Sequence, residues 1–197
     1  MNLALFDFDG TISRRDSFLY FLWSVNRARM VTICISSLPG IISYLAKRDP
    51  GTALKETFLT KMFAGYQLAT LSEQAEAYCS RLLPGIIRDD FWPCLQRHKG
   101  DGDIIYIVSA SPRIMLEPWC RHHQLRLIGT ELETDAHGCV TGRLSGKNCK
   151  GVEKVDRIVA EINLKEFGKI YAYGDTSSDL PMLELAEADK RFYKPFR

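Results

Sequence analysis

The 197-residue sequence lacks the patterns that would assign it to several common protein classes. It contains no GxGxxG or GxxxxGK[ST] segment, so a glycine loop for nucleotides has no support. None of its six cysteines form a CxxC pair, which leaves zinc and thioredoxin-type sites without support. No long basic run occurs and the net charge is only +2, so we expect no nucleic-acid partner and a solvated tail over 194–197.

Features of targeting and membrane insertion are sparse as well. Asp7 interrupts the first apolar run, which argues against a signal peptide, so we expect a cytoplasmic protein with reduced thiols. An uncharged stretch from Met30 to Ala46 is shorter than the ~20 residues that span a bilayer, and Pro39-Gly40 breaks it. Two interpretations stay open: an apolar interior of a cap, or a hairpin on a membrane surface beside the flanking basic residues. The second would make the protein membrane-associated.

What the sequence does have is the composition of a globular domain and three patterns of buried strands. Apolar residues make up 46% and charged residues 25%, and the length suits one main domain with a smaller insert. The runs 2–6, 103–108 and 169–173 are apolar almost throughout rather than alternating. Such runs are typical of strands covered on both faces. We therefore predict an α/β fold with a doubly wound parallel sheet.

The residues between the first two runs have no strand pattern and are predicted to be helical. This insert, residues 16–83, ends in a helix over 72–83 with Ser72 as its N-cap, and we expect it to cap the site. The core would then comprise residues 1–15 and 84–197. Further helices are predicted over 112–124 and 151–162. A β-hairpin is predicted over 130–144, with its turn at Asp135 to Gly138.

Each predicted strand ends in polar residues that could carry chemistry. Ligands of open α/β sheets bind at the carboxyl ends of the strands, so the three ends point to one site. The first strand ends in Asp7-Phe8-Asp9-Gly10-Thr11, where Gly10 lets the chain turn and both acids reach the same cavity. An ionised aspartate is a suitable nucleophile toward phosphorus, and Mg²⁺ would neutralise the charge of a phosphate ester. The second aspartate could protonate the leaving alkoxide.

The other two strand ends supply further candidates, each with a simpler alternative. Asp175 and Asp179 follow the third strand and either complete a metal site or form a turn. Ser109 follows the second strand, where its hydroxyl could bind phosphate oxygens, cap the next helix, or do both. A lysine near the start of the helix over 151–162 either pairs with the phosphate or is a solvated surface residue.

Taken in order, these segments resemble the signature of a known superfamily. DFDGT, IVSAS, a lysine segment and GDTSSD match the pattern of the haloacid dehalogenase-like phosphohydrolases, and they span nearly the whole chain. The insert is similar in size to that of the subgroup with a helical cap after the first strand, which includes phosphoserine phosphatase. Residues 148–155 resemble a bacterial branch of that subgroup, which includes phosphatidylglycerophosphate phosphatase C-like proteins. The resemblance implies a Rossmann-like core, bound Mg²⁺ and an aspartyl-phosphate intermediate.

The resemblance also implies a role for each matching residue. Asp7 would be the nucleophile and a metal ligand. Asp9 would be the general acid and base, with its backbone carbonyl on the metal. Asp175 would bind the metal, and Asp179 would support it through water or hold the lysine. Ser109 and that lysine would hold the transferred phosphoryl group.

Two lysines compete for that last role. The spacing between Lys154 and Asp175 is similar to that in phosphoserine phosphatases, so Lys154 is preferred and Lys150 is the alternative. Asp16 lies where those enzymes place an acid that faces the amino group of the substrate, although it could instead cap the first helix of the insert.

The substrate therefore stays open between two classes. Asp16 favours a small phosphorylated metabolite of the phosphoserine type, whereas the uncharged stretch fits a phospholipid-headgroup phosphatase with peripheral membrane contact. The aspartate at the second motif position, Asp9, favours phosphatases and phosphomutases over transport ATPases, which carry threonine there. A phosphotransferase or mutase and a non-catalytic phosphoryl-binding module rank below a hydrolase. No feature implies a protein partner.

Overall fold

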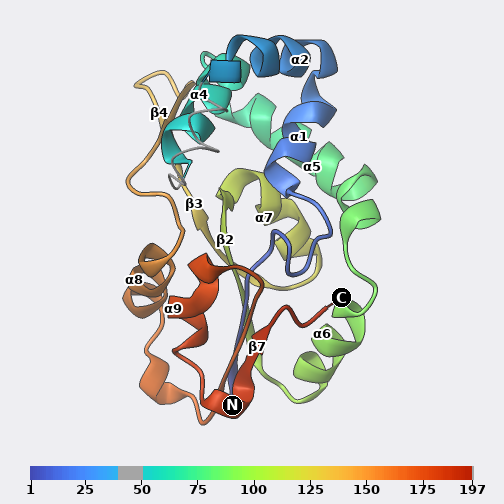
Figure 1. Ribbon diagram of the computed structural model, residues 1–197, viewed down its shortest axis with the longest axis vertical. Helices are drawn as coiled ribbons and strands as arrows, with labels where there is room; N and C mark the ends of the chain where they lie inside the picture. Colours follow the sequence, from blue (N-terminus) through green and yellow to red (C-terminus); the bar gives the residue numbers. More distant parts are fainter. Residues whose placement is uncertain (40–50, 197) are drawn as a thin grey trace.

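The computed structural model describes residues 1–39 and 51–196, and its centre is a five-stranded parallel sheet (Figure 1). The order of the strands is β3-β2-β1-β6-β7. The strands are β1 (Leu3–Phe6), β2 (Ile104–Pro112), β3 (Arg126–Thr130), β6 (Ile170–Gly174) and β7 (Arg191–Tyr193). In the centre, Leu3 of β1 lies beside Ile104 of β2 and Ile170 of β6. Because neighbouring strands are all parallel, their carboxyl ends meet at one edge of the sheet.

Helices cover both faces of the sheet, which explains why β1 is apolar at every position. Leu3 and Leu5 pack with α8 and α9 on one face, whereas Ala4 and Phe6 pack with α6 and α7 on the other. The four helices are α6 (Phe91–Gly100), α7 (Arg113–His122), α8 (Val152–Glu161) and α9 (Leu180–Leu183). Short 3₁₀ turns are η1 (Leu83–Ile86), η2 (Leu164–Glu166), η3 (Ser177–Asp179) and η4 (Ala188–Lys190). The predicted doubly wound α/β fold is confirmed.

The C-terminal end differs from the expectation. Residues 194–197 were expected to form a solvated tail, but Phe196 is buried between the rings of Phe91 and Tyr173. The ring of Phe196 stacks on that of Tyr173 at a centroid distance of 6.0 Å. The physical reason is that β7 returns the chain to the sheet, so a single aromatic residue after it can complete the core.

The insert contributes four described helices, which lie together above the carboxyl ends of the strands (Figure 1). They are α1 (Ser17–Val25), α2 (Arg27–Ser36), α4 (Thr52–Phe63) and α5 (Leu68–Arg81). Asp16 caps α1, because its carboxylate accepts a hydrogen bond from the N–H of Leu19 at 2.9 Å. Ser72 does not cap α5; that helix begins at Leu68, and Ser72 lies within it. The division between core and cap at residues 16 and 83 stays a prediction.

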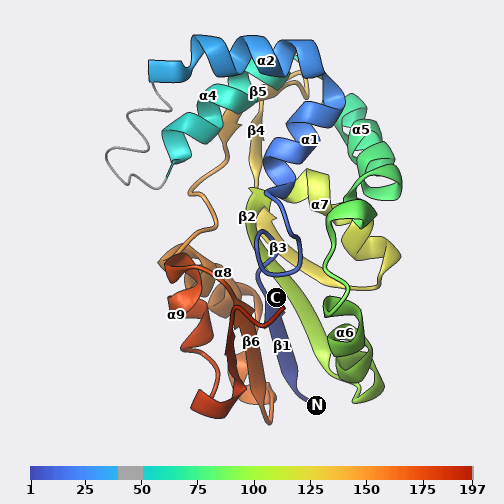
Figure 2. The ribbon, with the colours of Figure 1, turned by 45° about the vertical axis from the view of Figure 1, so that its right-hand side comes forward.

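The hairpin predicted over 130–144 is present, and it extends from the core to the insert (Figure 2). Its strands are β4 (Leu132–Thr134) and β5 (Val140–Leu144). Val140 exchanges backbone hydrogen bonds with the segment after α4: Gly65 N donates to its carbonyl at 2.9 Å, and its N–H donates to Tyr66 O at 2.8 Å. Gly142 lies against α4 so closely that a Cβ there would be 2.3 Å from the Cα of Thr60. Two separate segments, residues 16–83 and the hairpin over 130–144, therefore cover the strand ends, and we call them together the roof of the site.

The uncharged stretch is only partly described. Residues 30–36 belong to α2, residue 37 is a turn, residues 38 and 39 are again helical, and residues 40–46 lie outside the described part of the chain. Within α2, Met30 and Ile33 are buried in the core, whereas Val31 and Ile35 face outward. Among the helices of residues 1–39 and 51–196, none is both long and apolar enough to cross a bilayer.

Candidate active site

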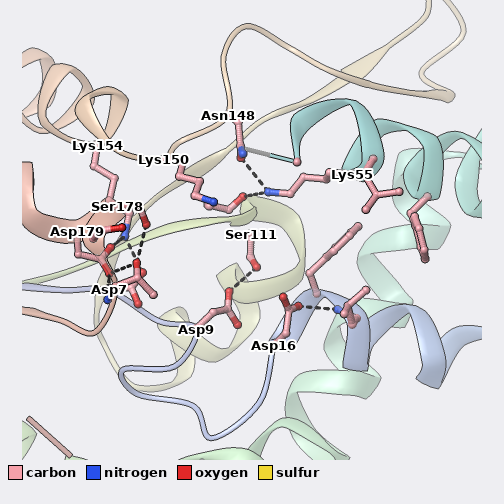
Figure 3. A pocket seen from close by; sticks show the side chains of 18 of the residues that line it. Asp7, Asp9, Asp16, Lys55, Ser111, Asn148, Lys150, Lys154, Ser178 and Asp179 are labelled. Carbon is pink, nitrogen blue, oxygen red and sulfur yellow. Dashed lines mark hydrogen bonds and ion pairs between the residues drawn. The ribbon is translucent and has the colours of Figure 1, made fainter. Parts of the chain in front are cut away.

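Asp7 and Asp9 follow β1, at the point where the chain turns away from the sheet. Asp7 still belongs to the ladder, because its N–H donates to the carbonyl of Tyr173 at 2.9 Å. The carbonyl of Phe8 then accepts a hydrogen bond from Ile12 N at 3.0 Å, which folds the loop back. Both aspartates line a pocket of about 610 Å³ between the sheet edge and the insert (Figure 3).

A buried lysine joins two of the predicted acids. Lys154, on α8, donates to Asp7 Oδ1 at 2.6 Å and to Asp179 Oδ1 at 2.7 Å, and it is only 1% exposed. Burial acts to lower the pKa of Lys154, but the two carboxylates outweigh burial and raise that pKa above its usual range. Lys154 therefore stays charged at neutral pH. Lys154, not Lys150, lies between the two acids, and its predicted role at the phosphate stays a prediction.

The two acids respond differently to this lysine. Burial raises the pKa of Asp7 to about 7, although Lys154 opposes the shift. Burial acts in the same direction on Asp179, but Lys154 and hydrogen bonds from Thr176 outweigh it and lower the pKa of Asp179. Of these two carboxylates, Asp7 has the negative charge that Lys154 compensates less. A further cation beside Asp7 would therefore favour its ionised form.

The end of β6 brings the second acidic segment to the same place. Asp179 Oδ2 accepts hydrogen bonds from the N–H and the hydroxyl of Thr176 at 3.0 and 2.9 Å, which fixes the turn η3. The hydroxyl of Thr11 donates to Asp7 Oδ2 at 2.9 Å and lies 3.3 Å from Asp175 Oδ1. Carboxylate oxygens of Asp7, Asp175 and Asp179 lie within 4.8 Å of one another. Three hard oxygen donors at this separation fit a small divalent cation such as Mg²⁺.

Gly10 makes this convergence sterically feasible. Its φ of +88° lies in the left-handed region, and a Cβ at this position would be 2.3 Å from Asp175 Oδ2. Any other residue would therefore displace the Asp175 carboxylate. Arg88 donates to the carbonyl of Gly10 at 3.2 Å, which helps to hold the loop.

The carboxylate of Asp9 is held from both sides of the pocket. Ser17 N, at the start of α1, donates to Asp9 Oδ1 at 2.6 Å. Ser111 Oγ, in β2, donates to Asp9 Oδ2 at 2.7 Å. One donor comes from the insert and the other from the core, so the orientation of Asp9 depends on the contact between them.

Three other predicted residues occupy distinct positions. Asp16 caps α1 and also lines the pocket, so the structure is compatible with both of its suggested roles. Lys150 lines the pocket beside the acids without contacting them. Ser109 is fully buried, and its hydroxyl oxygen accepts a hydrogen bond from Ser111 N at 3.0 Å, so it lies just behind the pocket wall.

Sequence reasoning did not single out several polar residues of the pocket, among them Ser111, Lys55 and Asn148. Ser111 was visible in the IVSAS segment, because it shares the alternation of Ser109 at the end of the strand. Lys55 on α4 gave no signal, since it resembles an ordinary surface residue in sequence, and Asn148 was noted only as part of the segment 148–155 and not as a pocket residue. The pocket brings them together: Lys55 Nζ donates to Asn148 Oδ1 at 2.8 Å.

The part of the pocket under the insert is apolar. Its lining there consists of side chains from α1, α2 and α4, namely Phe18, Leu19, Met30, Cys34, Leu54 and Phe58. The pocket thus has an acidic floor, cations in the middle and an apolar upper wall. This arrangement can bind a charged group at the floor and a larger organic group above it.

Comparison with known proteins gives a consistent family. The model of the haloacid dehalogenase-like hydrolases matches residues 4–184. Protein CicA of Caulobacter vibrioides is 33% identical to this chain in an alignment of 203 positions, which covers 99% of this chain and 86% of that protein.

Solved structures share the fold. A protein from Bordetella pertussis superposes with a TM-score of 0.78 at 24% identity, over 94% of this chain and 86% of that one. A substrate-bound phosphoserine phosphatase superposes with a TM-score of 0.63 at 16% identity, over 94% of this chain and 82% of that one. At these identities the likeness concerns the fold.

Proposed function

The chain belongs to the haloacid dehalogenase-like hydrolase family and is an enzyme of the phosphatase class, and on that premise we propose a specific reaction. In this reaction the enzyme uses Mg²⁺ to hydrolyse the phosphate monoesters of small phosphorylated metabolites, through an aspartyl phosphate on Asp7. The observation that carries this proposal is the buried group of Asp7, Lys154 and Asp179 at the floor of a pocket that Asp9 also lines.

The donor set fits the metal that this reaction needs. Asp7 and Asp175 would hold Mg²⁺, with Asp179 beside it and the backbone carbonyl of Asp9 as a further expected ligand. When bound, the ion supplies positive charge to the phosphoryl oxygens, which lets an anionic nucleophile approach an anionic ester. Lys154 supplies a further positive charge through its hydrogen bond to Asp7 Oδ1.

The residues of the chain divide the remaining work. A carboxylate oxygen of Asp7 bonds to phosphorus while the bond between phosphorus and the leaving oxygen breaks, and Asp9 gives its proton to that oxygen. Asp9 then takes a proton from water, whose oxygen attacks phosphorus and releases inorganic phosphate and free Asp7. Ser17 and Ser111 keep Asp9 aimed at the leaving oxygen during both steps. Lys154 holds the phosphoryl oxygens, and Ser109 supports the pocket wall from behind by accepting the hydrogen bond from Ser111 N.

Substitution of the two acids tests this assignment. Asp7→Asn is expected to abolish Mg²⁺-dependent hydrolysis of p-nitrophenyl phosphate, because the amide is not a nucleophile toward phosphorus. Asp9→Asn is expected to lower kcat by about 10²- to 10⁴-fold. The matched control is Asp156→Asn, an exposed aspartate on α8, which should keep wild-type turnover. Equal turnover by Asp7→Asn and the wild type, both folded by circular dichroism, would remove Asp7 from the mechanism.

A second candidate, a phospholipid-headgroup phosphatase, is favoured by one surface. Large apolar side chains are exposed along α1, along α2 and just after α2, namely Leu19, Trp23, Val31, Ile35 and Leu38, and Ile35 is 70% exposed. Arg27 and Arg29, at the start of α2, are exposed beside them. An apolar helix face with flanking cations is the arrangement that binds the interface of an anionic bilayer.

Vesicle binding tests this candidate. We expect the protein to co-sediment with vesicles of anionic phospholipid at low salt, and Ile35→Glu to reduce the bound fraction several-fold, because a carboxylate there opposes both burial in lipid and the surface charge. Val159→Glu is the control, since Val159 is exposed on α8, away from the insert. If the wild type stays in the supernatant, or if both variants bind alike, the surface of α2 has no role in lipid binding.

A further inference from the structure

The proposed reaction assigns no role to two cationic side chains of the pocket, Lys55 and Lys150. Lys154 pairs with Asp7 and Asp179 and serves the phosphoryl group, whereas Lys55 and Lys150 also line the pocket. Neither Lys55 nor Lys150 forms an ion pair with a carboxylate of the described residues. Figure 3 shows Lys150 between Lys154 and Lys55. The three lysines thus extend from the acidic floor toward the insert.

Lys55 is held in place by neutral groups rather than by an acid. Its Nζ donates to the carbonyl of Ala110 at 2.7 Å and to Asn148 Oδ1 at 2.8 Å, and it lies 5.8 Å from the ring centre of Phe18. Thr130 Oγ1 donates to the same carbonyl at 2.7 Å, which fixes the acceptor. An ammonium group has three donors, so one N–H of Lys55 remains for a ligand.

Lys150 reaches the pocket from a different element. It lies just before α8, and its backbone N–H donates to Asn148 O at 2.7 Å, so Asn148 positions both cations. Neither ammonium group has a carboxylate of the described residues within ion-pair distance, so an anion that joins the two would be favourable. Burial lowers the pKa of Lys55, and the nearby charges of Asp9 and Asp16 offset this shift only in part. Asp9 and Asp16 line the same pocket, but the first is bonded by Ser17 and Ser111 and the second caps α1.

We propose that Lys55 and Lys150 bind a second anionic group, carried by the alcohol portion of the substrate. This inference rests on the proposed function, because it places the transferred phosphoryl group on Asp7 and the second anion nearer the insert. The substrate class is then a phosphate monoester whose alcohol bears a phosphate, phosphodiester or carboxylate. The apolar wall beyond the two lysines, including Phe18 and Phe58, accommodates an apolar extension past that anion.

A purely structural role for Lys55 predicts something different. Its two hydrogen bonds join α4 of the insert to β2 and to the segment before α8, so its loss could loosen the insert. A loosened insert would slow hydrolysis of every substrate by a similar factor. Loss of an anion site would instead remove the preference between substrates that differ only in the second anion.

Matched substrates separate these roles. We compare kcat/KM for 3-phosphonopropyl phosphate, 3-carboxypropyl phosphate and 3-hydroxypropyl phosphate, in which the phosphonate cannot be hydrolysed. The wild type is expected to prefer the phosphonate over the hydroxyl compound by about tenfold or more, the effect of one charge-assisted hydrogen bond. Lys55→Met and Lys150→Met are expected to lower this ratio toward one, mainly through KM, and Lys55→Arg should restore part of it.

The control is Lys147→Met, an exposed lysine near the same segment but outside the pocket, which should keep the wild-type ratio. A wild-type ratio near one, or a ratio that persists in both methionine variants, would overturn the anion site. If Lys55→Met does not fold, Lys150→Met still decides, because none of the described residues accepts a hydrogen bond from its side chain. Loss of turnover on all three compounds and on p-nitrophenyl phosphate in the wild type would instead refute the proposed function.

A further arm identifies the source of the anion. A phospholipid whose headgroup ends in a phosphate monoester is offered in detergent micelles beside the soluble phosphonate compound. If the wild type prefers the lipid and both Lys55→Met and Lys150→Met reduce this preference, the second anion is a phosphodiester of a lipid. If the wild type prefers the soluble compound and the same variants reduce this preference, the second anion belongs to a metabolite with two anionic groups.

Discussion

At the scale of single residues, the contact between Gly10 and Asp175 is the most demanding in the site. Gly10→Ala is expected to reduce Mg²⁺-dependent turnover by at least about tenfold, because the new Cβ displaces the Asp175 carboxylate and because the left-handed backbone costs roughly 1–2 kcal/mol. Steady-state kinetics over a range of Mg²⁺ concentrations should show a higher concentration needed for half-maximal activity.

Gly65→Ala separates strain from collision. Gly65 has a similar φ of +85°, but nothing lies within 4 Å of its Cβ position. This variant should lose stability by a similar strain and keep the wild-type requirement for Mg²⁺. If both variants changed the requirement alike, the contact with Asp175 would not be the cause.

The acids of the site and Lys154 were named from the sequence, whereas Lys55 and Asn148 were not recognised as pocket residues. Asp7, Asp9, Asp175 and Asp179 follow apolar runs, so the geometry of a parallel sheet alone brings them to one edge. Lys55 reaches the pocket only because α4 folds back over the sheet. That placement depends on tertiary packing, which leaves no local pattern in the sequence.

At the scale of elements, the contact between β5 and α4 is the tightest part of the roof. Gly142→Ala is expected to destabilise the protein by about 2–4 kcal/mol, because a Cβ would collide with the backbone of Thr60 and because φ is +89°. Urea denaturation followed by tryptophan fluorescence measures this change. Gly138→Ala is the control: its φ is +74°, but its nearest neighbour would be 3.7 Å away, so only the backbone strain should appear. Equal losses of unfolding free energy in the two variants would mean that α4 moves aside for the new Cβ at no cost in stability.

Helices and strands were predicted with unequal success for physical reasons. The three long apolar runs are strands of the sheet, because burial on both faces demands such runs. β3 was overlooked because it begins with Arg126 directly after a predicted helix. β7 has only three residues, two of them exposed, so no run of apolar residues marks it. The helix that Ser72 was expected to cap starts earlier, at Leu68. No side chain caps α5, so no capping residue marks its start in the sequence.

At the scale of the whole molecule, metal binding and pH should be linked through Asp7. Burial raises the pKa of this carboxyl to about 7 in the absence of metal, so protons compete with Mg²⁺ below that pH. The rise in melting temperature on adding Mg²⁺ should be largest near pH 8 and should shrink as the pH falls through 7. One pH unit below the pKa weakens Mg²⁺ binding about tenfold, or roughly 1.4 kcal/mol, which corresponds to about 3–6 °C.

Differential scanning fluorimetry at pH 6 and pH 8 measures this linkage. Asp175→Asn should remove most of the Mg²⁺-dependent rise at both pH values, because it removes a ligand without changing Asp7. A rise of the same size at pH 6 and pH 8 in the wild type would show that Asp7 does not take part in binding the ion.

The construction of the roof has a consequence for exchanging parts between relatives. Residues 16–83 and the hairpin over 130–144 are joined by backbone hydrogen bonds between Val140 and the segment Gly65-Tyr66. A chimera that imports only the first segment would break this junction and leave strand edges unpaired. A working graft would need both segments from the same donor. New specificity in this enzyme is therefore expected to require coordinated change at two distant places in the chain.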